Sequence, residues 1–337
     1  MEIMRAYEIT SDGGIEQLSL NEREVPPLKS GEVLVRMKAS SVNYRDLMTV
    51  LDPVSRGIPF PRIPNSDGAG VVEEIGPGVT RFKVGDRVCG IFMQGWIDGA
   101  IHSSYMKTAL GGTAEGMLAE YGVLNQDGLV LIPKELSFEE AATLPCAAVT
   151  AWNSLFETGR VKSGSKVLLL GTGGVSIFAL QFCNMVGAQA IITSSSDKKL
   201  ERAKSLGAWS TINYLSESDW DNKVLALTDG EGVDHTVEVG GAGTLEKTIN
   251  ATKVGASIGL IGVLAGGKVN PNTIMRKSIK LQGIYVGSRR MFENMNKAIS
   301  ENSIKPTIDK VIDFENAKEA FKIMEEAQHF GKLVVKI

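Results

Sequence analysis

Glycine residues concentrate where an expected buried strand turns into an expected helix. Gly171, Gly173 and Gly174 follow the apolar run 167–170, and the residues after them have helix-compatible spacing. The free backbone N–H groups and the positive end of the helix dipole at such a turn bind anions, and glycine lets a pyrophosphate come close. Ser176 stands where the G-x-G-x-x-G pattern has its third glycine, and a small side chain still fits there. The alternative is a glycine turn that merely packs tightly.

The elements around this turn alternate between strand and helix. Apolar patterning predicts strands at 167–170, 190–193, 211–213, 233–239, 256–261 and 279–286. Helical stretches at 198–206, 220–227 and 244–252 lie between them. This order is typical of an α/β fold with a doubly wound parallel sheet, which binds its ligand at the switch point beside the first strand.

The rest of the chain has a different texture. Up to about residue 131, short strands such as 32–39, 68–75 and 84–88 are broken by glycine and proline, which predicts a small, distorted β-barrel. The stretch 94–116 reads as a long loop, and 138–156 as a helix leading into the parallel sheet. The apolar end 332–337 needs a sheet to join, so we expect it to return to the barrel and make that module discontinuous.

The bulk numbers exclude several classes of protein. Apolar residues make up 43% of the 337 residues and charged residues 22%, with a net charge of −3. The sequence has no dense basic cluster of the kind that binds nucleic acid, and no apolar run is long enough to span a membrane. The N-terminus does not have the pattern of a signal peptide. Three widely spaced cysteines argue against a disulfide framework, so we expect a cytoplasmic protein.

Five short motifs occur along the chain in an order that indicates a family. They are Ser-Val-Asn-Tyr-Arg-Asp at 41–46, Gly-Ala-Gly-Val-Val at 68–72, Val-Gly-Asp-Arg-Val at 84–88, Leu-Pro-Cys-Ala-Ala-Val-Thr-Ala-Trp at 144–152, and Gly-Thr-Gly-Gly-Val at 171–175. With these motifs the chain closely resembles the medium-chain dehydrogenase/reductase superfamily, and within it the zinc-free quinone-oxidoreductase-like branch. The resemblance implies a GroES-like catalytic domain (1–147, completed by 286–337), a Rossmann domain (148–285), and a cleft between them for hydride transfer.

The resemblance also bears on metal binding. Zinc-dependent relatives hold their catalytic metal with Cys, His and Cys at positions that match Asn43, Ser66 and Cys146 here. One such ligand remains of the three that a tetrahedral catalytic site needs, and 91–120, where relatives carry structural cysteines, has none. We therefore expect no zinc. Cys146 then reads as a small buried hydrophobe.

Without a metal to polarise a simple ketone, the easy acceptors are those that spread negative charge themselves, such as quinones or conjugated enones. Asn43 and Tyr44 lie at the matching position and can donate hydrogen bonds, while Asp46 and Asp67 are expected to orient neighbours. Asn43 could instead only satisfy backbone groups, and Tyr44 could be a core residue.

The end of the second strand indicates the cofactor. NAD-selective sites place an acidic residue there. This chain has Ser194 and Ser195, with Asp197 already at the start of the helix, where it also fits an N-cap. The hydroxyls can bond a 2′-phosphate and Lys199 adds positive charge, which favours NADP(H) over NAD(H). The basic residues of this helix could equally form a solvated face.

Further cofactor contacts follow from the resemblance and from the carboxyl ends of the strands. With the turn itself, the predicted set is Thr150, Gly171, Thr172, Gly173, Gly174, Val175, Tyr214, Gly240, Gly262, Val263, Gly287, Ser288 and Arg289. Arg289 is expected to reach a phosphate or the substrate. None of the three histidines has metal-ligand spacing.

The sequence thus predicts a zinc-independent NADPH oxidoreductase acting on quinones or conjugated enones. A zinc-free NADP-dependent alcohol dehydrogenase or carbonyl reductase is the first alternative, and a non-catalytic NADPH-binding sensor or structural protein is the second. A homodimer is expected, with the strand at 279–286 pairing across a two-fold axis, and no nucleic acid or membrane partner.

Overall fold

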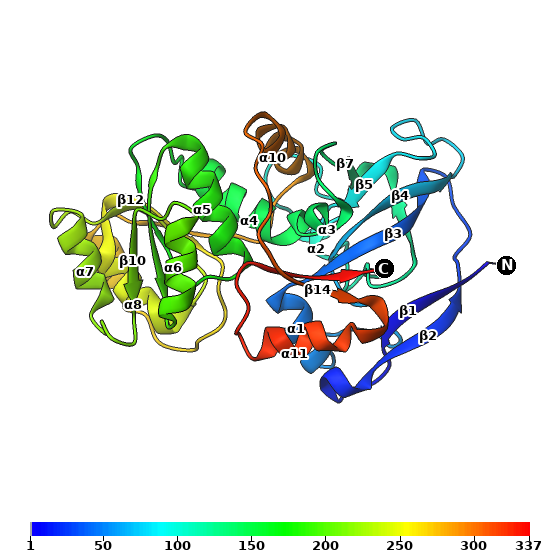
Figure 1. Cartoon of the computed structure of the whole chain (residues 1–337), viewed down its shortest axis with the longest axis horizontal. Helices are drawn as coiled ribbons and strands as arrows, with labels where there is room; N and C mark the ends of the chain where they lie inside the picture. Colours follow the sequence, from blue (N-terminus) through cyan, green and yellow to red (C-terminus); the bar gives the residue numbers. More distant parts are fainter. Residues whose placement is uncertain (1) are drawn as a thin grey trace. The chain divides into compact units, whose positions relative to one another are not determined.

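The computed structural model describes residues 2–337, which form two compact units (Figure 1). The central unit is Thr150–Val286. The discontinuous unit joins the chain up to Val149 with Gly287–Ile337. These divisions lie one or two residues from the expected ones. Within the described residues, no helix combines the length and apolarity that crossing a membrane would need.

A six-stranded parallel sheet forms the centre of the central unit, in the order β10-β9-β8-β11-β12-β13. Its strands are β8 (Lys166–Leu169), β9 (Gln189–Ser194), β10 (Ser210–Asn213), β11 (Val233–Glu238), β12 (Thr252–Leu260) and β13 (Lys280–Gly283). Helices α5 (Gly174–Val186), α6 (Asp197–Ser205), α7 (Trp220–Leu227) and α8 (Ala242–Ala251) pack against it, and α9 (Pro271–Arg276) precedes β13. The strand order reverses beside β8, which places the glycine turn at the switch point.

Burial explains why these segments are strands. Val167, Leu168 and Leu169 of β8 have no exposed surface, as expected for a strand covered on both faces. Helix α5 ends at Gly187, whose φ of 73° is a left-handed conformation that glycine adopts without steric cost. The doubly wound sheet predicted from the alternation is confirmed.

The discontinuous unit is built on a seven-stranded sheet in the order β14-β15-β3-β4-β5-β7, with β6 also pairing with β3. Its strands are β3 (Glu32–Val42), β4 (Asp67–Ile75), β5 (Arg87–Gly90), β6 (Tyr121–Asn125), β7 (Leu129–Leu131), β14 (Ile308–Asp313) and β15 (Lys332–Lys336), beside a β1 (Ile3–Ile9)–β2 (Leu18–Glu24) hairpin. Its helices are α1 (Tyr44–Leu51), α2 (Ser103–Met106), α3 (Phe138–Ala141), α10 (Arg289–Glu301) and α11 (Lys318–Glu325). The terminal strand β15 pairs antiparallel with β3, as expected from its apolar sequence.

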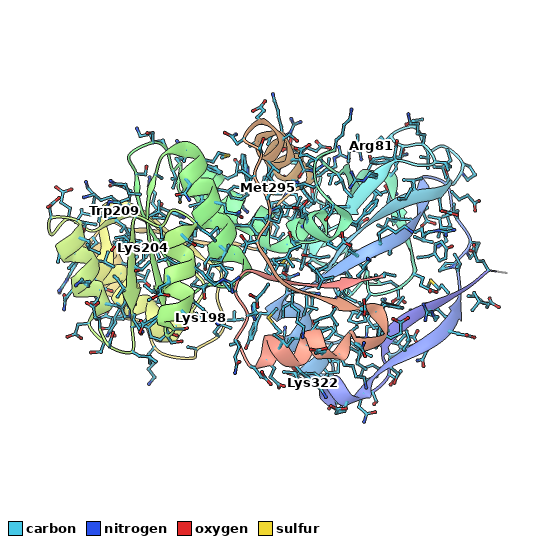
Figure 2. The ribbon with its side chains drawn as sticks, in the orientation of Figure 1. Arg81, Lys198, Lys204, Trp209, Met295 and Lys322 are labelled. Atoms are coloured by element: carbon cyan, nitrogen blue, oxygen red, sulfur yellow. The ribbon has the colours of Figure 1, made fainter. Side chains whose placement is uncertain are left out.

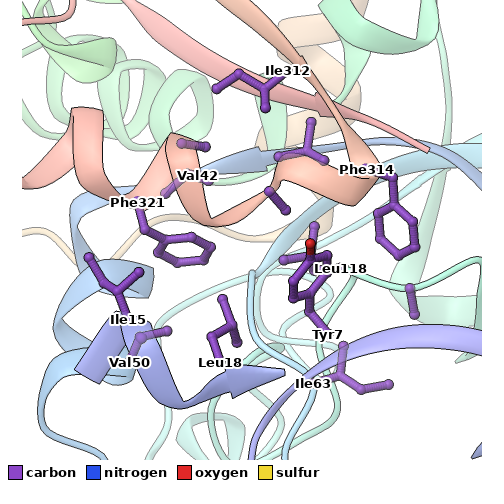
Figure 3. Packing of buried hydrophobic residues seen from close by; sticks show 14 of the residues in the cluster. Tyr7, Ile15, Leu18, Val42, Val50, Ile63, Leu118, Ile312, Phe314 and Phe321 are labelled. Carbon is purple, nitrogen blue, oxygen red and sulfur yellow. The ribbon is translucent and has the colours of Figure 1, made fainter. Parts of the chain in front are cut away.

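One core of this unit combines distant parts of the chain. Figure 3 shows Tyr7, Leu18 and Val50 from the first fifty residues beside Phe314 and Phe321. The Tyr7 and Phe314 rings meet edge to face with centroids 5.4 Å apart, and the Tyr7 hydroxyl donates to the Glu315 carbonyl. Because these side chains are buried together, the last part of the chain is fixed to the first.

The prediction of one continuous helix at 138–156 is wrong, because the stretch consists of several short helical segments. Ser137 and Glu140 form a capping box that starts α3, but a π-helical segment, Leu144–Ala148, follows after a short turn. Pro145 lacks an N–H group and cannot make the usual backbone bond there. A four-residue helix, α4 (Val149–Trp152), and a second π-helical segment complete the stretch. Similarly, the strand expected at 84–88 begins only at Arg87, because Gly85 forms a turn with a φ of 90°.

A buried histidine makes the central unit sensitive to pH. The His235 ring nitrogens lie 2.9 Å from the Ser154 hydroxyl and 2.8 Å from the Ser257 hydroxyl. Burial lowers the pKa of His235 from 6.5 to about 4. The unfolded chain therefore binds a proton at a higher pH than the folded chain. We expect the free energy of unfolding to be fully present above pH 6.5 and to fall by about 3 kcal/mol as the pH drops towards 4.

Urea unfolding followed by hydrogen exchange of central-unit peptides measures this effect. His235→Asn should be less stable overall but should lose the component of pH dependence between 6.5 and 4. Equal slopes in the wild type and the variant would contradict a neutral buried His235.

Candidate active site

A buried polar cluster forms at the start of α1. The backbone N–H of Asn43 donates to Asp46 Oδ2 at 2.9 Å, and the Asn43 side-chain nitrogen donates to the same oxygen at 3.2 Å. Asp46 Oδ1 accepts from Arg45 at 2.8 Å and from the Ser66 backbone N–H at 3.1 Å. Asp46 thus caps the helix and also ties it to the segment that precedes β4. The expectation that Asp46 orients its neighbours fits this geometry.

Asp67 is the second buried carboxylate of the cluster. Its Oδ1 accepts from the Ser66 hydroxyl at 2.8 Å and its Oδ2 from the Ser41 hydroxyl at 3.2 Å. Burial raises the pKa of Asp67, while nearby Lys332 and the Asn43 amide oppose this increase. The Ser40 hydroxyl holds the Asp67 backbone carbonyl, so β3 and β4 share the cluster.

Lys332, which begins the terminal strand, supplies a buried ammonium group. Its Nζ donates to Asn43 Oδ1 at 2.5 Å and to the Val42 carbonyl at 3.0 Å, and lies 3.9 Å from Asp67 Oδ2. The side chain is only 3% exposed. Lys332 is not among the site residues predicted from the sequence. Its one signal was a lysine that opens a strand with an apolar centre, and its partners lie almost 290 residues earlier in the chain.

These partners fix the orientation of the Asn43 amide. An ammonium group only donates, so the amide oxygen must face Lys332, and a carboxylate only accepts, so the nitrogen faces Asp46. Both ends of the amide thus bond within the cluster, and donation from Asn43 to an acceptor stays a prediction. Tyr44, the next residue, is 37% exposed whereas Asn43 is 7% exposed. Of these two residues, the tyrosine is the accessible donor.

The donor set at the three metal-matching positions does not fit zinc. Asn43 offers an amide oxygen already bonded to an ammonium group, and the Ser66 hydroxyl donates to Asp67. Burial raises the pKa of the Cys146 thiol, which disfavours the thiolate that binds metals. Within residues 2–337, no three His, Cys, Asp or Glu side chains are grouped to hold a metal ion.

In the central unit, the glycine turn is built to leave N–H groups available. Gly171 has a φ of 70°, and Gly173 caps α5 without any side-chain hydrogen bond to the first turn. The Ser176 hydroxyl donates to the Leu170 carbonyl at 2.6 Å, and Thr193 accepts from the Gly171 N–H. The serine in place of a third glycine therefore braces the turn from inside. Thr172 is buried beside it, while Gly174 and Val175 open α5.

The end of β9 carries hydroxyl groups and no acidic side chain. Ser194 is buried and Ser195 is exposed. Ser196, not Asp197, caps α6 by accepting from the Lys199 N–H, which corrects the predicted N-cap. Asp197 accepts instead from Asn213 at 2.7 Å. The next basic residues extend from α6, where Figure 2 marks Lys198 and Lys204, and Tyr214 is exposed just after β10.

A carboxylate organises the loop after β11. Glu238 is fully buried, and its Oε1 accepts from the backbone N–H groups of Gly240 at 2.7 Å and Gly241 at 3.0 Å, and from Thr244 at 2.8 Å. Its other oxygen accepts from Thr248. The Gly262 N–H donates to the Glu238 backbone carbonyl, so the ends of β11 and β12 are joined. Val263 beyond it is exposed, and Thr150 is buried at the start of the unit.

Three predicted cofactor residues belong to the discontinuous unit. Gly287 begins its second segment, and Ser288 caps α10 by accepting from the Met291 N–H. The Arg289 guanidinium donates to the Asp127 backbone carbonyl at 2.9 Å and pairs with the Asp127 carboxylate at 3.3 Å. These bonds anchor the Arg289 side chain within its own unit, and its contact with a phosphate or the substrate stays a prediction.

Family models match both parts of the chain. The "alcohol dehydrogenase GroES-like domain" matches residues 29–134, and the "zinc-binding dehydrogenase" model matches residues 174–301. The chain belongs to the medium-chain dehydrogenase/reductase superfamily. It is accordingly an oxidoreductase of the alcohol dehydrogenase-like type, and its family depends on a nicotinamide cofactor.

Relatives of this medium-chain dehydrogenase/reductase carry different names. A zinc-type alcohol dehydrogenase-like protein of Schizosaccharomyces pombe is 45% identical, with 96% of each chain covered. A 2-methylene-furan-3-one reductase of Solanum lycopersicum is 31% identical over 98% of this chain and 79% of that protein. A quinone oxidoreductase of Rattus norvegicus is 25% identical over 99% of this chain and 98% of that protein.

The solved structure of an NAD-dependent alcohol dehydrogenase superimposes on this medium-chain dehydrogenase/reductase with a TM-score of 0.90. The two chains are 34% identical, and the match covers 99% of this chain and 100% of that one. The GroES-like and Rossmann folds expected from the resemblance are thereby confirmed.

Proposed function

We propose that the protein is a zinc-independent, NADPH-dependent reductase of quinones or conjugated enones. The observation that carries this proposal is the donor set at the metal-matching positions, where an amide and a hydroxyl replace two zinc ligands and Lys332 already bonds the amide. A metal normally stabilises the alkoxide formed from a simple carbonyl. A conjugated acceptor spreads that charge itself, so hydrogen-bond donors suffice.

The preference for NADPH rests on the end of β9. Ser194 and Ser195 place hydroxyl groups there instead of a carboxylate, and Lys199 follows on the first turn of α6. In this proposal Gly171 to Val175 hold the pyrophosphate through backbone N–H groups, and Tyr214 covers the adenine-ribose end. The reduced nicotinamide supplies the hydride when bound. Gly240, Gly262, Val263 and Thr150 form its nearer contacts.

Tyr44 is the proposed hydrogen-bond donor to the acceptor oxygen, since it is exposed where Asn43 is not. Two named relatives support the acceptor class. The tomato protein's name specifies an enone, and the rat protein's name specifies quinones. Asp46 and Asp67 do not touch the acceptor in this proposal but hold the segment on which Tyr44 lies.

Steady-state assays with NADPH and NADH against a quinone, an enone and a secondary alcohol test the proposal. We expect turnover with the quinone or the enone, faster with NADPH, and unaffected by dialysis against a chelator. Turnover of the alcohol alone would favour the dehydrogenase reading that several relatives' names carry. Cofactor binding without oxidation of NADPH by any acceptor would instead favour a sensor.

We also propose that the protein is a homodimer through the edge strand β13. This strand ends the parallel sheet, so one side of its backbone has no partner strand within the described chain. Exposed apolar side chains of the same unit, including Met275 and Tyr285, would be covered in a dimer. Light scattering should give twice the mass of the chain, and a monomer at micromolar concentration would contradict this interface.

A further inference from the structure

An asparagine at the end of β10 holds an aspartate at the start of α6. The Asn213 side-chain nitrogen donates to Asp197 Oδ1 at 2.7 Å. The Asn213 side-chain oxygen accepts from the Leu215 backbone N–H at 3.0 Å. A backbone N–H only donates and a carboxylate only accepts, so these two partners fix the orientation of the amide. Asn213 therefore holds the Asp197 carboxylate on its own side of the helix start.

This pair lies where the fold would bind the ribose of a dinucleotide. Doubly wound folds bind the adenosine ribose at the carboxyl end of the second strand, which here is β9. Asn213 ends β10 and is paired in register with Ser194, the last residue of β9. Because β9 lies between β8 and β10, the bond holds the Asp197 carboxylate on the β10 side of β9, opposite to the glycine turn after β8.

We propose that Asn213 sets the cofactor preference by holding the carboxylate of Asp197 away from the 2′-phosphate of NADPH. This inference rests on the proposed function, since it concerns the same cofactor site. Asn213 does not touch the cofactor. It acts through Asp197 and is therefore a positioning residue.

A carboxylate close to the 2′ position acts in opposite directions on the two cofactors. It accepts hydrogen bonds from the ribose hydroxyls of NADH, and it repels the 2′-phosphate of NADPH. Asp197 follows directly after the serines 194–196 and is exposed, so its charge lies at the edge of this position. A shift of an exposed carboxylate by a few ångströms relative to a phosphate changes binding by about five- to tenfold at low ionic strength.

Substitutions separate the bond to Asp197 from the turn that follows β10. Asn213→Ser keeps an oxygen that can accept from the Leu215 N–H, but its side chain is too short to reach Asp197. Asp197→Asn removes the charge, and the double variant combines the two changes. The matched control is Asn250→Ser. Asn250 also donates to an aspartate, Asp221, at 2.7 Å, but it lies near the end of α8, just before β12 begins.

Dissociation constants for NADPH and NADH, measured by titration of cofactor fluorescence at low ionic strength, test the proposal without any acceptor. Asn213→Ser should lower the preference for NADPH over NADH by about five- to tenfold. In the Asp197→Asn background the same substitution should leave the preference unchanged, because no charge remains to be positioned. Asn250→Ser should bind both cofactors as the wild type does.

A purely structural role of Asn213 predicts a different pattern. Asn213→Ser would then weaken both cofactors equally, or change the preference by the same factor with and without the Asp197 charge. Either result would overturn the inference, as would a wild type that binds neither cofactor. The proposed function fails in another way. If Asn213 and Asp197 are coupled in cofactor binding but the enzyme reduces neither quinone nor enone, the proposed function fails and the role of Asn213 stands.

Discussion

Replacing Ser195 with aspartate is expected to lower kcat/KM for NADPH by about a hundredfold or more, which corresponds to about 3 kcal/mol of lost binding. Ser195 is exposed at the carboxyl end of β9 and precedes the serine that caps α6. A carboxylate there would face the 2′-phosphate of NADPH and repel it, while it could accept hydrogen bonds from the ribose hydroxyls of NADH. Steady-state kinetics with both cofactors measure the change.

Ser163→Asp is the matched control. Ser163 is also exposed, but it precedes β8 and lies at the amino edge of the parallel sheet, away from the carboxyl ends of the strands. It should leave both cofactor constants unchanged. If Ser195→Asp affected NADPH and NADH equally, the end of β9 would not contact the 2′-phosphate and the preference for NADPH would be withdrawn.

Glu238→Ala should be among the most destabilising single substitutions in the central unit, at about 4 kcal/mol or more. The buried carboxylate accepts from two backbone N–H groups and from the hydroxyls of Thr244 and Thr248. Truncation would leave these donors without their acceptor and open a cavity. Chemical denaturation, with hydrogen exchange of the peptides that cover 236–248, measures both the global loss and the local opening.

Glu238→Gln separates the hydrogen bonds from the side-chain volume. Its amide oxygen can keep the two glycine N–H groups and Thr244, while its nitrogen can donate to the Thr248 hydroxyl, so we expect a much smaller loss. Glu246→Ala, on the exposed face of α8, controls for removal of a glutamate. A Glu238→Ala protein as stable as Glu246→Ala would show that the loop does not depend on the buried carboxylate.

The parallel sheet could be predicted from the sequence because its signals are local. Each strand is a short apolar run between helical stretches, and the turn at Gly171 and Gly173 combines backbone conformation with helix capping within a few residues. The family motifs were needed to predict the discontinuous unit, because glycine and proline interrupt the pattern of its strands in the sequence. Among the predicted strands of the parallel sheet, only the bounds differ from those observed. The largest example is β13, which covers four of the eight residues expected.

The parts that could not be predicted depend on long-range contacts. The anchoring of Arg289 could not be predicted because its partner, Asp127, lies 162 residues earlier in the chain. The bond from Lys332 to the Asn43 oxygen could not be predicted either, because nothing nearby in the sequence indicates it. The 138–156 segment has helical composition throughout, yet two parts of it are π-helical, and Pro145, which lacks a backbone N–H, lies in the first of them.

The position of Lys332 on β15 has a consequence for biosynthesis. Asn43 and Lys332 are separated by 289 positions, so ribosomal synthesis delivers one partner long before the other. Until the lysine emerges and β15 docks beside β3, the buried carboxylates have no second counter-ion. The polar cluster therefore cannot form until translation has passed residue 332.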